Sequence, residues 1–173
     1  DAIVVTGTLG DHSAAVTLAR KEFSLSARIR SDCASLAPML LPAVEHFGDA
    51  VHCMRDLTRG GLATALCEIA DSAGAAFSID EEAVPVKKNV RTLCELFGYD
   101  PLYLANEGKA VIFCAPQKSE GLVSQLRAHS LGRNAARIGT VVSGEKGRVV
   151  MRTKTGGQRL VEMLSGDQLP RIC

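Results

Sequence analysis

The most informative absences are of tryptophan, of aromatic side chains in general and of any excess of one charge. The 173 residues include no Trp, and aromatic residues make up 4%, so stacking platforms for nucleic-acid bases are not expected. Lys and Arg number 20 and Asp and Glu 19, a net charge of +1, whereas nucleic-acid-binding domains carry a strong basic excess. No apolar run approaches the roughly 18 residues of a membrane-spanning helix. We therefore expect neither nucleic acid nor a membrane as a partner.

The six cysteines lack any close pairing in the sequence. None of them forms a Cys-x-x-Cys spacing, which argues against a zinc ribbon or a thioredoxin-type motif, and we predict no metal site. Those at positions 53, 67, 94 and 114 lie in apolar, periodic segments, as buried small hydrophobic residues do. Scattered thiols and the lack of a signal peptide favour the reducing cytoplasm.

The rest of the composition is that of a globular domain, with 46% hydrophobic and 23% charged residues. Apolar β-branched runs alternate with segments of helical period, and a Gly-Gly turn at 156–157 indicates a late antiparallel hairpin. The expected fold is α/β of the α+β type, a mixed sheet covered by helices. We predict strands at 2–6, 50–54, 76–80, 109–114, 136–142, 148–152 and 159–163, and helices at 11–21, 31–47, 62–73, 86–97 and 119–129. Pro38 offers an alternative start for the second helix.

The loop 55–61, Arg-Asp-Leu-Thr-Arg-Gly-Gly, links a predicted strand to the start of a predicted helix. A helix N-terminus offers unpaired N–H groups to an anion, glycines let the anion approach the backbone, and Arg59 suits a bidentate contact with phosphate. The alternative is a capped helix start, with Thr58 as N-cap and a solvated Arg59. The Lys-Ser/Thr end of a Walker A loop is missing.

Two further segments place chemically capable side chains beside glycines. In 105–108, Ala-Asn-Glu-Gly, Glu107 suits a general base in a partly buried setting, and Asn106 suits a group that orients a carbonyl or amide. The alternative there is a simple turn. In 9–12, Leu-Gly-Asp-His, a helix start carries His12 at a position typical of an active-site lip; the alternative is an N-capped helix with an exposed histidine.

The last segment, 166–173, shows no periodicity and is predicted to be a flexible tail that carries Cys173. Chain ends fray, and many terminal cysteines have no role. An extended segment of this length nevertheless reaches roughly 25 Å, at about 3.3–3.6 Å per residue. The Cys173 thiol therefore suits a carrier that moves between an active site and a second enzyme.

Taken together, these segments resemble the C-terminal half of the hydrogenase maturation factor HypE family. The agreement is colinear over nearly the whole chain and comprises Gly10-Asp-His12, Ser31-Asp-Cys33, the loop 55–61, Asp80-Glu-Glu-Ala-Val-Pro85, the segment 100–108, Leu131-Gly-Arg133 and the Pro-Arg-Ile-Cys ending at 170–173. Leu57 departs from the family pattern, in which we expect Pro in many relatives. The resemblance implies membership of the superfamily of aminoimidazole ribonucleotide synthetase and selenophosphate synthetase, whose members have two α/β domains. It implies that 1–165 is the second domain, that 166–173 is the tail, and that the N-terminal ATP-binding domain is absent from this chain.

By the same resemblance, the activity is the ATP-dependent dehydration of a carbamoyl group on Cys173 to a thiocyanate, which supplies cyanide ligands for [NiFe]-hydrogenase iron. The implied roles are Glu107 as the base, Asn106 as the group that holds the carbamoyl, and His12 as a further residue of the cleft. The implied phosphate-stabilising residues are Thr58, Arg59, Gly60 and Gly61. ATP and Mg²⁺ would bind mostly to the absent domain, through which a homodimer forms. The implied partners are the carbamoyltransferase HypF and a HypC–HypD scaffold complex, and the isolated chain is expected to be inactive.

Two other functions stay open at this point. One is a sister ATP-dependent phosphotransferase or synthetase of the same superfamily, of the selenophosphate synthetase or thiamine-phosphate kinase type, in which the tail is incidental. Full activity after deletion of Cys173 would favour it. The other is a non-enzymatic docking fragment that presents its tail to partners, and robust ATP hydrolysis by the isolated chain would argue against it.

Overall fold

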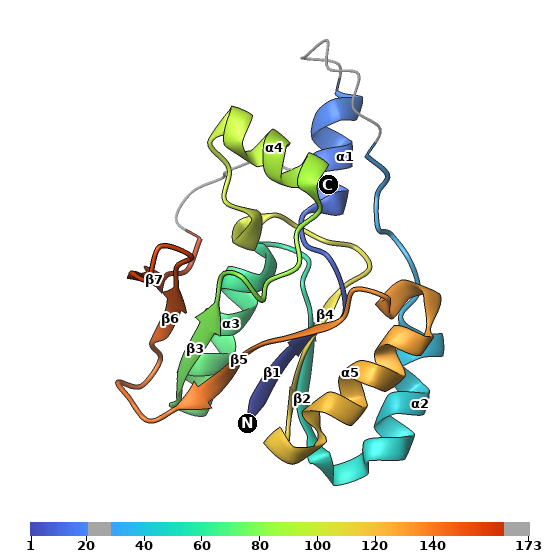
Figure 1. Ribbon diagram of the computed structural model, residues 1–173, viewed down its shortest axis with the longest axis vertical. Helices are drawn as coiled ribbons and strands as arrows, with labels where there is room; N and C mark the ends of the chain where they lie inside the picture. Colours follow the sequence, from blue (N-terminus) through green and yellow to red (C-terminus); the bar gives the residue numbers. More distant parts are fainter. Residues whose placement is uncertain (21–28, 165–173) are drawn as a thin grey trace.

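The computed structural model describes residues 1–20 and 29–164, so the predicted tail with Cys173 and the expected helix end at Lys21 lie outside the described residues. Its strands form one seven-stranded sheet in the order β2-β4-β1-β5-β3-β6-β7 (Figure 1). The strands are β1 (Ala2–Val5), β2 (Val51–Asp56), β3 (Ala76–Asp80), β4 (Ala110–Cys114), β5 (Ala136–Val142), β6 (Val149–Arg152) and β7 (Gln158–Val161). The helices are α1 (Asp11–Ala19), α2 (Ala37–Phe47), α3 (Gly61–Ala73), α4 (Lys88–Phe97) and α5 (Ser119–Ala128), with 3-10 helices η1 (Gly48–Ala50), η2 (Pro101–Tyr103), η3 (Pro116–Lys118) and η4 (Ser130–Gly132).

The pairing of the strands confirms the predicted mixed sheet. The central strand β1 is antiparallel to both β4 and β5, and β2 is antiparallel to β4. β3 is antiparallel to β5 and parallel to β6, and β6 and β7 form the predicted antiparallel hairpin. β1, β2 and β3 therefore run in one direction, and the loops that follow them emerge at the same edge of the sheet.

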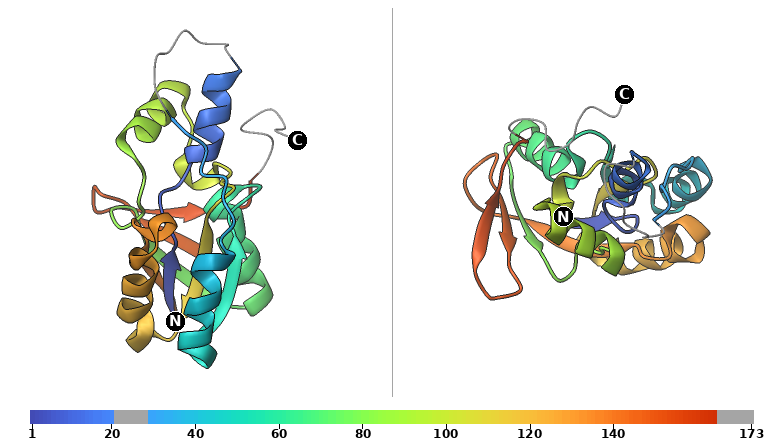
Figure 2. Two further views of the ribbon diagram at one scale, coloured as in Figure 1. Left: turned by 90° about the vertical axis from the view of Figure 1, so that its right-hand side faces the viewer. Right: turned by 90° about the horizontal axis from the view of Figure 1, so that it is seen from above.

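Two apolar clusters pack helices against this sheet, and a third packs helices against each other beyond its edge. On one face, Phe77 and Phe113 pack with their ring centroids 5.0 Å apart beneath α3. On the other face, α2 and α5 cover β1 and β4 through a cluster that includes Val4 and Ile112. A third cluster, which includes Leu104, joins α1 to α4 beyond the sheet edge at which β1 ends (Figures 1 and 2). None of the helices in the described part of the chain has the length and apolar run that a membrane crossing requires.

The prediction of a helix from residue 31 is wrong, and the alternative start at the proline is nearly right. Residues 29–36 are not helical, and α2 begins at Ala37 with Pro38 in its first turn. Proline is well suited to the first turn of a helix, because the N–H group that it lacks would have no partner within the helix there. Aspartate is a common N-cap residue, but the Asp32 carboxylate instead forms an ion pair with Lys109 from the loop before β4.

Candidate functional site

The predicted site segments meet at the edge of the sheet where β1 and β2 end and β4 begins. The loop after β1 leads into α1, and the loop after β2 leads into α3 (Figure 1). Between these two loops lies the segment 105–109 that enters β4. Three segments that are far apart in the sequence therefore form one connected loop cluster.

Asn106 ties these three loops together. Its Oδ1 accepts a hydrogen bond from the Gly10 N–H at 2.8 Å, and its Nδ2 donates to the carbonyls of Leu57 (3.2 Å) and Leu104 (2.9 Å). The Leu57 carbonyl also accepts the backbone N–H of Asn106 at 3.0 Å. Asn106 is 0% exposed, and both hydrogens of its amide are used inside the protein. This geometry favours an indirect role, in which Asn106 sets the shape of the loops, over direct contact with a carbamoyl group.

Close packing at the start of α3 accounts for the presence of two consecutive glycines there. Gly60 and Gly61 are buried and have positive φ angles of 73° and 58°, which side-chain-bearing residues rarely adopt. A Cβ atom on Gly61 would lie 2.5 Å from the carbonyl oxygen of Leu102 and 2.6 Å from that of Leu104, and one on Gly60 would overlap with Thr64. The pair therefore lets α3 begin directly against η2.

Thr58 and Arg59 lie just before this turn and have different surroundings. The Thr58 hydroxyl donates to Asp56 Oδ2 at 3.1 Å, while the N-cap position of α3 is taken by Gly60. The Arg59 side chain is exposed and makes no hydrogen bond or ion pair with the residues that the structure describes. Of the four residues predicted to stabilise phosphate, Arg59 is thus the one with its donors open to an incoming anion.

Glu107 directly follows Asn106 and is exposed. Its carboxylate has no partner within the described residues, but its backbone N–H donates to Asp32 Oδ1 at 3.1 Å. The partly buried setting expected for this residue is therefore not met by the described residues alone. Its role as a base stays a prediction.

His12, on the first turn of α1, is reached by the same 29–36 segment. Its Nδ1 lies 2.9 Å from Ser31 Oγ, which also accepts the backbone N–H of Cys33 at 3.1 Å. Ser31 and Asp32 are consecutive, so this segment connects His12 on one side to the Glu107 backbone on the other. Its described contacts link two of the predicted catalytic residues without placing them in direct contact.

Two acidic residues with buried side chains were given no role in the predicted site, although Asp11 lies in the segment 9–12. The Asp32 side chain is 5% exposed and pairs with Lys109, which is 8% exposed. Asp11 is 1% exposed; its Oδ2 accepts the Thr8 hydroxyl at 2.5 Å, and its Oδ1, which has no hydrogen bond, lies 3.0 Å from Lys87 Nζ. Both ion pairs line a polar cavity of about 290 Å³ beside the loop cluster. The sequence held one indication that Asp32 belongs to the site. It lies in Ser31-Asp-Cys33, one of the segments that carry the family resemblance.

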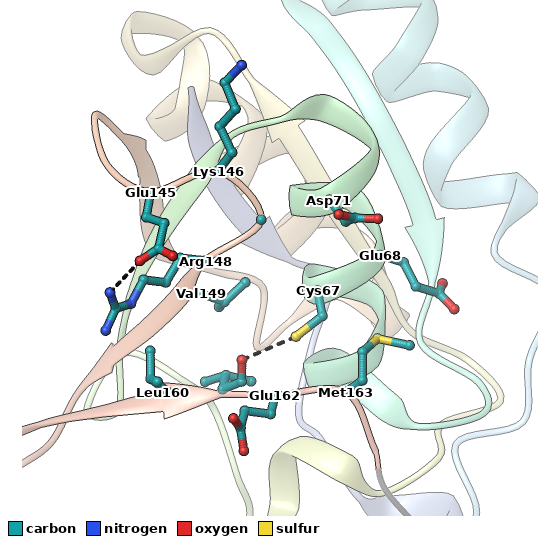
Figure 3. A pocket seen from close by; sticks show the side chains of 12 residues that line it. Cys67, Glu68, Asp71, Glu145, Lys146, Arg148, Val149, Leu160, Glu162 and Met163 are labelled. Atoms are coloured by element: carbon teal, nitrogen blue, oxygen red, sulfur yellow. Dashed lines mark hydrogen bonds and ion pairs between the residues drawn. The ribbon is translucent and has the colours of Figure 1, made fainter.

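A larger groove of about 640 Å³ lies elsewhere, between α3 and the β6–β7 hairpin (Figure 3). Its floor includes Cys67, whose Sγ donates to the Val161 carbonyl at 3.3 Å. Burial raises the pKa of the Cys67 thiol, and the carboxylates of Glu162 and Glu68 raise it further, so this thiol is not activated as a nucleophile. The groove contains none of the predicted site residues.

A metal site has no support from the side chains described. Within 1–20 and 29–164, no group of three or more His, Cys, Asp or Glu side chains lies close enough to hold a metal ion.

Comparison with known proteins identifies the class first. Residues 1–152 match the family model described as AIR synthase related protein, C-terminal domain. The chain therefore belongs to the AIR synthase related family and represents its C-terminal domain. Thiamine monophosphate kinase of Aquifex aeolicus, at 19% identity and a TM-score of 0.57 over 91% of this chain and 51% of that chain, shares the fold alone.

Within that family, the sequence of this chain is similar to those of HypE proteins. The chain is 46% identical over 173 residues to "Carbamoyl dehydratase HypE" of Bradyrhizobium diazoefficiens and likewise 46% identical to that of Cupriavidus necator. It covers 50% and 49% of these proteins, so it spans about half the length of the curated relatives it matches.

Solved HypE structures share the fold closely. A crystal structure of hydrogenase maturation protein HypE superposes with a TM-score of 0.93 at 43% identity, over 99% of this chain and 55% of that one. HypE in complex with ATP gives 0.92 at 43% identity, over 99% and 52%. A HypE–HypF complex gives 0.88 at 36% identity, over 94% and 52%.

Proposed function

We propose that this chain is the C-terminal part of a carbamoyl dehydratase of the HypE type, which acts in the maturation of [NiFe]-hydrogenases. The observation that carries the proposal is the 46% identity over all 173 residues to a carbamoyl dehydratase HypE. In this proposal, 1–165 is the C-terminal domain, 166–173 is the tail that carries Cys173, and the ATP-binding domain lies in the half of the relatives that this chain does not span.

In the proposed reaction, Cys173 carries a carbamoyl group as a thiocarbamate, S–C(=O)–NH₂. An amide oxygen is a poor leaving group, so it first receives the γ-phosphoryl group of ATP while one N–H proton leaves, which gives ADP and an imidate phosphate. Loss of the second N–H proton and of phosphate then forms S–C≡N. The products are the thiocyanate, ADP and phosphate, and no oxidant or reductant is needed.

The residues of this chain supply proton transfer and charge stabilisation to that reaction. Glu107 accepts an N–H proton, since its exposed carboxylate has no competing partner among the described residues. Arg59 offers its open guanidinium to phosphate oxygens, next to Thr58 and the rigid turn of Gly60 and Gly61. Asn106 holds the loops that carry both groups. His12 completes the lip of the cleft, and no step is assigned to it.

Cofactors and partners follow from the same proposal. The likeness to HypE in complex with ATP supports ATP as the phosphoryl donor. Mg²⁺ is assigned to the half outside this chain, as the family resemblance implies. The likeness to a HypE–HypF complex supports HypF as the carbamoyltransferase that loads Cys173. A HypC–HypD complex accepts the cyanide, and the homodimer forms through the N-terminal half. The free cysteines of the described residues suit a reducing cytoplasm.

The test uses the full-length protein loaded by the carbamoyltransferase with carbamoyl phosphate and ATP. Glu107→Gln keeps the shape of the side chain and removes the base, so we expect thiocyanate formation to fall by about 10²–10⁴-fold. Glu120→Gln is the matched control, because Glu120 is an exposed carboxylate in α5. This variant should form thiocyanate at the same rate as the unmodified protein. Dehydration at an unchanged rate in Glu107→Gln would show that the base is another group.

A further inference from the structure

The position of Glu107 is fixed through its backbone. Its side chain is exposed and without a partner among the described residues, so side-chain packing does not aim it. The direct constraint is the hydrogen bond from its backbone N–H to Asp32 Oδ1, at 3.1 Å. A general base must lie within hydrogen-bond reach of the proton it removes, so the location of this peptide group decides where the carboxylate acts.

Asp32 is itself held rigidly. Its side chain is 5% exposed, and its second oxygen, Oδ2, accepts a hydrogen bond from Lys109 Nζ at 3.0 Å. Lys109 is 8% exposed and also donates to the Gly108 carbonyl at 3.1 Å. A charge-assisted hydrogen bond in a buried setting is strong and directional. The two carboxylate oxygens of Asp32 thus connect Glu107 to the base of strand β4.

The neighbouring glycines show that the chain leaves space for this arrangement. A Cβ atom on Gly108 would overlap with the backbone carbonyl of Asp32, and one on Gly7 would lie 2.8 Å from Lys109 Cε. Neither glycine has a positive φ angle, so their backbone conformations do not require glycine. At Gly108, the close approach of the Asp32 backbone is what requires glycine.

We propose that Asp32, supported by Lys109, is a positioning residue that fixes the Glu107 peptide and so aims the Glu107 carboxylate at its substrate. This inference rests on the proposed function, in which Glu107 is the base. A base displaced by about 1 Å costs up to about 10²-fold in rate. Loss of the Asp32 acceptor therefore lowers kcat and leaves the KM for ATP unchanged, because neither Asp32 nor Lys109 is assigned a contact with ATP.

Two double variants of the full-length protein isolate the acceptor. Both carry Lys109→Met, which removes the buried positive charge, and they differ at one position, Asp32→Asn or Asp32→Leu. Asparagine keeps an oxygen that accepts the Glu107 N–H, while leucine has a similar size and no acceptor. The net charge change is the same in both. Thiocyanate formation, the KM for ATP and hydrogen exchange of the Glu107 amide are measured in each.

We expect the variant with Asp32→Leu to have a kcat about 10²-fold below that with Asp32→Asn, with equal KM values for ATP and a faster-exchanging Glu107 amide. Equal kcat values in the two variants would overturn the proposal, because a merely structural ion pair predicts no dependence on the acceptor. If the leucine variant does not fold, the hydrogen-exchange rate of the Glu107 amide in the unmodified protein is the deciding measurement. Exchange as fast as in an unstructured peptide would also overturn the proposal. Normal turnover in Glu107→Gln would instead refute the proposed function, in which Glu107 is the base. The two failures are distinguishable, because the two double variants would then still differ in the hydrogen exchange of the Glu107 amide.

Discussion

Replacement of Asn106 by alanine tests the claim that this side chain holds the loop cluster together. The change removes the acceptor for the Gly10 N–H and the donor to the Leu104 carbonyl, at a residue that is 0% exposed. The Leu57 carbonyl keeps a partner, because the backbone N–H of residue 106 also donates to it at 3.0 Å. Each buried polar group left without a partner costs about 1–3 kcal/mol, so the free energy of unfolding should fall by about 3 kcal/mol.

Urea unfolding followed by far-UV circular dichroism measures this loss, with linear extrapolation to water. A loss of that size corresponds to a melting temperature lower by about 6–12 °C for a domain of this length. Asn134→Ala is the matched control, because Asn134 is exposed and exposed substitutions usually change stability by less than about 0.5 kcal/mol. Asn106→Asp keeps the acceptor for Gly10 and turns an oxygen toward the two carbonyls, so it should destabilise the domain at least as much as alanine.

Equal stability of Asn106→Ala and Asn134→Ala would refute the reasoning. It would mean that water or a shift of the loops replaces the lost hydrogen bonds, and that residue 106 is free to serve a ligand. A large loss with alanine and a small one with aspartate would show that the contact with Gly10 matters and that the two donated bonds do not.

The remaining predictions concern backbone conformation, pH and the isolated domain. Gly61→Ala should cost more than about 1 kcal/mol, because φ is 58° and the new Cβ would lie 2.5 Å from the Leu102 carbonyl oxygen. Gly121→Ala, on the exposed side of α5, should instead stabilise by about 0.5–1 kcal/mol; the opposite order in chemical unfolding would contradict the described start of α3. Burial raises the pKa of the Cys94 thiol from 9.0 to about 11, with a further contribution from Asp100. The folded state therefore holds this proton more tightly than the unfolded state, its contribution to stability is complete below pH 9, and it is lost as the pH rises toward 11. Cys94→Ala should flatten that part of the stability–pH profile, and an unchanged slope would refute the assignment. The isolated chain should not hydrolyse ATP in a coupled ADP-release assay, and steady turnover would show that it carries a complete nucleotide site.

The strands at the centre of the sheet were predictable because β1 and β4 are short apolar runs that are buried at every position. The mixed character of the sheet followed from alternation plus one hairpin signal at Gly156 and Gly157, and β6 and β7 do pair antiparallel. The start of α2 was misjudged because Ser31 and Asp32 have the side chains of a helix cap but are used in tertiary contacts with His12 and Lys109. Local propensity cannot reveal a partner that lies 77 positions away.

The candidate site shows the same division. Glycines at 60 and 61 suggested an anion-binding loop, while the structure shows that their lack of side chains first serves the packing of α3 on η2. Asn106 was identified by its type and its neighbours, yet its hydrogen bonds to Gly10 and Leu57 could be known only once the three loops were placed together. Asp32 was present in a recognisable segment, but its role depends on the distance from its carboxylate to a backbone group of Glu107.

The most direct test of the central claim is the mass of the C-terminal peptide of the full-length protein, after carbamoyl transfer and then after addition of ATP. The account predicts that transfer adds the elements of HNCO to Cys173 and that ATP then removes the mass of one water from the same residue. Replacement of Cys173 by Ser should abolish both changes. Cyanation at another cysteine, or a carbamoylated Cys173 that keeps its water in the presence of ATP, would contradict the account.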